Sequence, residues 1–93
     1  MAGQASVTSS AVQGGIRCCE ISIQELEGTI RKLLQNYHAA GAGGWRDQKY
    51  TELGALVQEC CSALKQPTGE LQECMRKLQE IQAVIRRYEE TSL

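Results

Sequence analysis

The chain has 93 residues, a length that allows one domain at most. Its 10 Lys and Arg nearly balance its 11 Asp and Glu, and it has no Phe, one Trp and three Tyr. This composition offers neither the basic surface nor the stacking aromatic side chains that bind nucleic acid. It contains no run of roughly 18 apolar residues that could span a membrane, and no basic and apolar signal peptide. We therefore expect synthesis in the cytoplasm without membrane insertion.

The first part of the chain changes character near residue 16. Residues 1–15 are mostly small and polar, which predicts a flexible tail because little apolar surface is available to offset the entropy of ordering. From there on, apolar residues recur at alternating intervals of three and four, the pattern of a packed helix. These residues are Ile16, Cys19, Ile23, Leu26, Ile30, Leu33 and Tyr37. Ser22 and Glu25 match a capping box, so Ile16 and Ser22 are alternative starts of this helix.

A glycine-rich segment follows and predicts a turn at residues 40–46. Gly43 and Gly44 tolerate the backbone angles that a tight reversal requires. Trp45 comes directly after them, and its large side chain either packs where the helices meet or forms part of a docking surface. Asp47 is the expected N-cap of the second helix.

The second helical pattern is longer and contains a proline. Its apolar residues keep the same spacing and are Tyr50, Leu53, Val57, Cys60, Leu64, Leu71, Cys74, Leu78, Ile81, Ile85 and Tyr88. Pro67 either kinks one long helix or lies in a turn, residues 66–69, between two helices. The seven-residue interval from Leu64 to Leu71 preserves the phase and favours the kink.

These patterns predict an all-α fold, an antiparallel helical hairpin in residues 16–91, whose second helix is the longer one and kinks near Pro67. The expected hairpin core consists of Ile23, Leu26, Ile30, Leu33, Tyr37, Leu53, Val57, Cys60 and Leu64. With the loop centre near Gly43, Leu26 faces Cys61 and Ile16 faces Leu71.

Beyond Leu71 the first helix would have ended, which leaves an apolar stripe uncovered. The stripe is the expected partner-binding seam and consists of Leu71, Cys74, Leu78, Ile81, Ile85 and Tyr88. A second copy, a different partner chain or a fold-back at Pro67 would each cover it. Two chains paired as a four-helix bundle is the favoured arrangement, and homodimer and heterodimer remain alternatives.

The chemistry-bearing residues do not form a recognisable active site. The five cysteines have no C-x-x-C spacing and include two adjacent pairs, so we expect reduced, mostly apolar side chains rather than a metal site or a disulfide framework. The five cysteines are Cys18, Cys19, Cys60, Cys61 and Cys74. His38 is the only histidine and has no nucleophile at an informative spacing. We expect no enzyme activity and no cofactor.

Trp45-Arg46-Asp47 in a turn between two amphipathic helices resembles the Trp-x-Gly family of small type VII secretion proteins, with Asp47 in place of the glycine. The resemblance implies a dimeric four-helix bundle that is exported without a signal peptide through an ATPase-driven machine, or that escorts a larger exported toxin. Proteins of this pathway often end in Tyr-x-x-x-Asp/Glu. Here Tyr88 is followed by Ser92 at the last position, so the export signal is incomplete.

Three hypotheses follow for the function. The leading one is a secretion protein of this class, acting as a substrate or as an escort for a partner. The second is a cytoplasmic helical adaptor or coiled-coil assembly factor unrelated to secretion. The third, the weakest, is a redox or metal-binding protein that uses the cysteine pairs.

Overall fold

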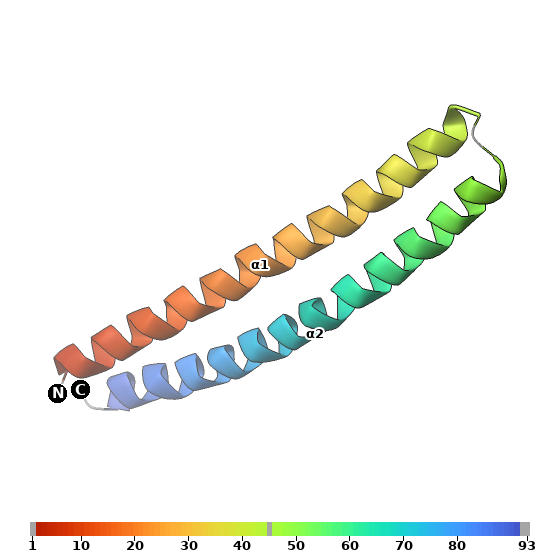
Figure 1. Cartoon of the computed structure of the whole chain (residues 1–93). Coiled ribbons are helices and arrows are strands. Elements are labelled where there is room, and N and C mark those ends of the chain that lie inside the picture. Colours follow the sequence, from red (N-terminus) through yellow and green to blue (C-terminus); the bar gives the residue numbers. More distant parts are fainter. Residues whose placement is uncertain (1, 45, 92–93) are drawn as a thin grey trace. The chain divides into compact units, whose positions relative to one another are not determined.

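A computed structural model describes residues 2–44 and 46–91, with side chains from residue 9 onward in these ranges. It contains two helices, α1 (Ala2–Ala42) and α2 (Gln48–Thr91), and no strand within the described residues. The two helices and the connection between them form an all-α helical hairpin (Figure 1). Their lengths of 41 and 44 residues are nearly equal, although the sequence pattern predicts a much shorter first helix.

The largest departure from the sequence pattern is the start of α1. The helix begins at Ala2, so residues 2–15 are helical where the composition predicts a tail, and neither Ile16 nor Ser22 is its first residue. The physical reason is contact with the last part of α2. The backbone of Gly15 lies against Leu78, and Gln82 Nε2 donates a hydrogen bond of 2.5 Å to Gln13 Oε1.

The connection is shorter and later than predicted. α1 continues to Ala42, and the non-helical residues begin at Gly43. Gly44 has a φ of 95°, a left-handed conformation that glycine adopts without steric cost. Asp47 is the N-cap of α2, because its Oδ1 accepts a hydrogen bond of 3.1 Å from the Tyr50 N–H. Trp45 lies outside the described residues.

α2 runs through Pro67 without interruption, which excludes a turn at residues 66–69. Proline removes one backbone donor from a helix interior, so the Ala63 carbonyl loses its usual partner. At the next position, the Thr68 hydroxyl donates to the Leu64 carbonyl at 2.9 Å. A kink at Pro67 stays a prediction.

Contacts divide the chain into two units, each containing segments of both helices. Unit 1 consists of residues 1–23 and 70–93, and unit 2 of residues 24–69. The core of unit 1 contains the buried side chains of Ile16, Cys19 and Ile23. In unit 2 the buried side chains are Val57 and Cys61, with Leu26, Ile30, Leu33, Tyr37, Leu53 and Leu64 half-buried around them.

Apart from Leu53 and Pro67, the residues of α2 that are buried or half-buried repeat at intervals of four and three along its length. We call them the inner seam. They are Tyr50, Gly54, Val57, Cys61, Leu64, Thr68, Leu71, Met75, Leu78, Gln82, Ile85 and Glu89. One predicted core residue is corrected by this pattern: Cys60 is exposed and its neighbour Cys61 is buried, because the spacing after Val57 is four residues rather than three.

The pairing of the helices also differs from the predicted register. Leu78, rather than Leu71, lies next to Gly15 in unit 1. In unit 2, Cys61 lines a small pocket with Ile30 and Leu34 rather than facing Leu26. Both differences have the same cause. α1 extends to Ala42, so the centre of the connection lies about two residues later in the chain than predicted.

Candidate functional site: an exposed seam on helix α2

Large apolar side chains are exposed on one strip of α2. Leu56, Ile81, Val84 and Tyr88 are 58%, 50%, 56% and 73% exposed, and the remaining large apolar side chain described as exposed is Ile21 on α1. The sequence positions of the four residues on α2 differ by a multiple of seven, or by three or four residues more than such a multiple. They therefore belong to one heptad pattern.

We call this pattern the outer seam. Its members follow one another at intervals of three and four and are Leu53, Leu56, Cys60, Ala63, Pro67, Glu70, Cys74, Lys77, Ile81, Val84 and Tyr88. At 3.6 residues per turn, the outer seam points roughly 110° away from the inner seam. α2 thus has two faces that contain apolar side chains, the inner seam and the outer seam. α1 packs against the inner seam.

The outer seam has a part in each unit. In unit 2, Leu53 is half-buried and Leu56, Cys60 and Ala63 are exposed. In unit 1, all six members from residue 70 to residue 88 are exposed, and they are Glu70, Cys74, Lys77, Ile81, Val84 and Tyr88. The unit 1 part is the longer uncovered surface, and Glu70 and Lys77 give it polar positions among the apolar ones.

The partner-binding seam predicted from the sequence separates into two sets. Leu71, Leu78 and Ile85 are half-buried members of the inner seam, whereas Cys74, Ile81 and Tyr88 are exposed members of the outer seam. The separation follows from the early start of α1, because Gly15 lies against Leu78 and Gln13 is hydrogen-bonded to the neighbouring Gln82. Sequence reasoning missed Leu56 and Val84, although Leu56 lies three residues after the predicted core residue Leu53, and Val84 lies three residues after Ile81 of the predicted stripe.

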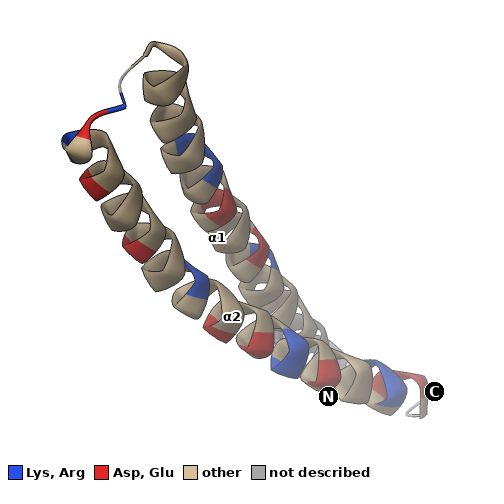
Figure 2. Ribbon diagram, turned by 90° about the vertical axis from the view of Figure 1, so that its right-hand side faces the viewer, with Lys and Arg blue, Asp and Glu red and all other residues tan. Residues whose placement is uncertain are grey.

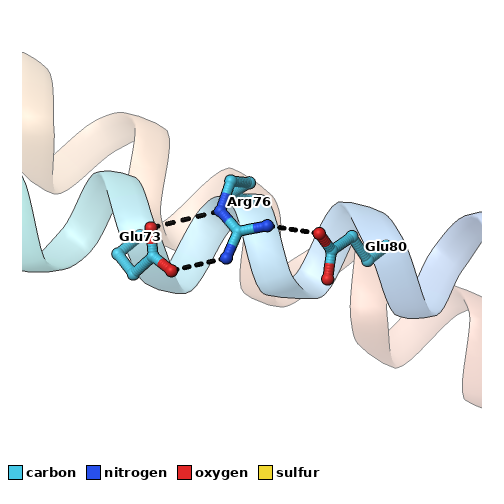
Figure 3. Close-up of polar contacts among 3 residues, drawn as sticks. All are labelled: Glu73, Arg76 and Glu80. Atoms are coloured by element: carbon cyan, nitrogen blue, oxygen red, sulfur yellow. Dashed lines mark hydrogen bonds and ion pairs between the residues drawn. The ribbon is translucent and has the colours of Figure 1, made fainter.

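Charged side chains of both signs are interspersed along α2 (Figure 2). Arg76 donates to the carboxylates of Glu73, at 2.6 Å and 3.1 Å, and of Glu80 (Figure 3). The hydrogen bonds from Arg76 hold the pKa of the Glu73 carboxyl below its usual value, and the two carboxylates raise the pKa of Arg76. All three side chains are more than half exposed, so this network is a surface feature of modest strength.

Two stacked tyrosines lie near the connection in unit 2. The rings of Tyr37 and Tyr50 are 4.4 Å apart with an angle of 6° between their planes, and the Tyr50 hydroxyl donates to the Tyr37 carbonyl. Desolvation of the phenol, with a smaller effect of the Tyr37 hydroxyl, raises the pKa of Tyr50. Gly41 and Gly54 lie against the rings, where a Cβ atom would overlap Tyr50 and Tyr37 respectively.

An open pocket of about 560 Å³ adjoins the tyrosine pair. His38 and Arg46 line it together with the two rings, and it contains no carboxylate, thiol or second histidine that would act with His38 as an acid–base pair. The side chains around the pocket come from α1, α2 and the connection between them.

The five cysteines differ in their exposure to solvent. Cys19 and Cys61 are buried, Cys18, Cys60 and Cys74 are exposed, and all five are free. Among the described residues, no group of three or more His, Cys, Asp or Glu side chains is arranged to hold a metal ion. Nor does any described helix combine the length and the apolar character needed to cross a membrane.

No protein family, curated protein or solved structure was found to match the chain.

Proposed function

We propose that this chain is a non-enzymatic interaction protein whose outer seam binds a helix of another polypeptide chain. The observation that carries the proposal is the exposure of Leu56, Ile81, Val84 and Tyr88 at heptad spacing on a helix whose other face is already packed. Exposed apolar side chains in one contiguous pattern mark interaction surfaces. Seven-residue periodicity matches the packing of one helix along another.

The experiment is photo-cross-linking in the cells that produce the protein. A benzophenone amino acid replaces Val84 on the outer seam or, as the control, Gln35, an exposed residue of α1. We expect a discrete cross-linked product from position 84 and none from position 35. The absence of any product at position 84, including cross-linked pairs of this chain, would contradict the proposal.

A second candidate is the narrower role in type VII secretion, as a substrate or as the escort of an exported toxin. The hairpin of two helices with Trp45 between them is the observation that favours it. Deletion of the gene is expected to remove a second protein from the culture medium. If the set of exported proteins is unchanged and the chain itself stays inside the cell, the adaptor role is the better description.

A further inference from the structure

We infer that the helix bound by the unit 1 part of the outer seam is the same segment of a second copy of this chain, running antiparallel. The inference rests on the proposed function, because it names the partner of that surface. The segment extends from Glu70 to Tyr88, about 27 Å of helix at 1.5 Å per residue. Three of its six seam members are large apolar side chains that are half exposed or more, namely Ile81, Val84 and Tyr88.

The two columns of the seam are complementary when one copy is reversed. In an antiparallel helix pair, each residue of one column packs against a residue of the other column in the partner helix. Centring the pair between residues 77 and 81 sets Val84 against Cys74 of the second copy, a large side chain against a small one. The same register sets Tyr88 against Glu70 of the second copy, so that the phenol can donate a hydrogen bond to the carboxylate.

The central contact of this register pairs Ile81 with Lys77 of the second copy. The aliphatic part of a lysine side chain packs on apolar surface while its ammonium group reaches solvent. Glu80 lies on the border of the seam next to this position, so the ammonium group of Lys77 can meet a carboxylate of the other copy. The polar members of the seam therefore find partners instead of interrupting it.

The charges that border the seam supply the argument for the direction. Glu73, Glu80 and Arg87 are spaced seven residues apart on one edge of the seam. In the antiparallel register described above, the two copies of this edge lie beside each other, about one residue away from the centre of the seam. Glu73 therefore faces Arg87 of the second copy, and this contact occurs twice. Glu80 faces Glu80 of the second copy. Lys77 lies beside this contact, and Arg76 forms an ion pair with Glu80 within each chain. In a parallel pair this edge would instead face the opposite edge of the second copy, which contains Leu71, Leu78 and Ile85, so Glu73 and Arg87 would not meet.

The test is sedimentation equilibrium of the purified full chain over a wide concentration range. We expect the wild-type chain to dimerise reversibly and Val84→Glu to weaken the dimer on the order of tenfold or more. The matched control is Leu56→Glu, which introduces the same charge at a comparably exposed outer-seam residue outside the segment. Helical content by circular dichroism verifies that each variant is folded.

A pair of charge reversals tests the direction and the identity of the partner together. Glu73→Arg and Arg87→Glu each create two like-charge contacts in an antiparallel homodimer, so each variant alone is expected to dimerise several-fold more weakly. An equimolar mixture of the two variants restores both opposite-charge contacts and is expected to recover the wild-type dissociation constant.

Three outcomes would overturn the inference: a folded monomer at every concentration, a dimer more sensitive to Leu56→Glu than to Val84→Glu, or a mixture no stronger than its components. The broader proposal has a separate outcome. A folded monomer that still cross-links to a different protein from position 84 would retain the interaction function and reject the second copy as its partner.

Discussion

At the scale of single residues, the clearest structural constraint is the reciprocal packing of glycines and tyrosines in unit 2. Each tyrosine ring of the stacked pair lies against a glycine of the other helix, Tyr37 against Gly54 and Tyr50 against Gly41. A glycine within a helix costs about 1 kcal/mol relative to alanine. The close approach of the rings is a reason for these two positions to remain glycine, because a Cβ atom at Gly54 would lie 2.8 Å from Cζ of Tyr37.

Substitution of Gly54 by alanine tests this constraint. The control is Gly69→Ala, in the same unit and helix, where a Cβ atom would meet nothing within 4 Å. Both changes gain the same helix propensity, so the difference between them isolates the cost of overpacking, about 1–3 kcal/mol. Urea unfolding measures it. Equal stabilisation by both substitutions would show that the Tyr37 ring moves aside freely.

At the scale of elements, the ordered start of α1 and the two faces of α2 decide what remains exposed. Residues 2–15 have few apolar side chains, yet Gly15 and Gln13 contact Leu78 and Gln82 of α2. Short-range composition therefore understates the tendency of this segment to form a helix, because most helical stability in proteins comes from tertiary packing.

Deletion of residues 2–15 tests whether this segment contributes to the fold. We expect the truncated chain to lose more helical signal than the deleted residues account for, and to unfold at a lower urea concentration, because Leu78 and Gln82 lose their contacts in α1. Circular dichroism and urea titration measure both effects. A truncated chain with the same unfolding midpoint would support the flexible tail that the composition predicts.

At the scale of the whole molecule, the two units have separate cores, and each contains one buried cysteine. Cys19 is buried in unit 1 and Cys61 in unit 2, whereas Cys18, Cys60 and Cys74 are exposed. The thiols therefore report the opening of each unit without any added label.

We expect two classes of thiol reactivity in the monomeric chain at low concentration. The three exposed thiols should react quickly with a disulfide reagent, and the two buried thiols only as fast as their units open. Mass spectrometry of the modified peptides compares Cys19 with Cys61. Different protection of these two residues indicates separate opening of the units, and equal protection indicates a single cooperative transition. Rapid modification of Cys19 or Cys61 would contradict the burial of these side chains.

The sequence by itself determined the hairpin, because its two heptad patterns and the glycine-rich segment between them are local signals. It also predicted the cap at Asp47 and the continuity of α2, since the phase survives across Pro67. The heptad of the first helix coincides with the half-buried and buried side chains of α1 from Ile16 to Tyr37.

Only the tertiary structure decided which face of α2 is covered. Spacings of three and four are equally compatible with a helix after Val57, so periodicity did not distinguish Cys60 from Cys61 or separate the inner from the outer seam. The choice depends on where α1 begins and on the register that its length imposes. Both follow from contacts between residues far apart in the chain, such as Gly15 with Leu78, which no local pattern encodes.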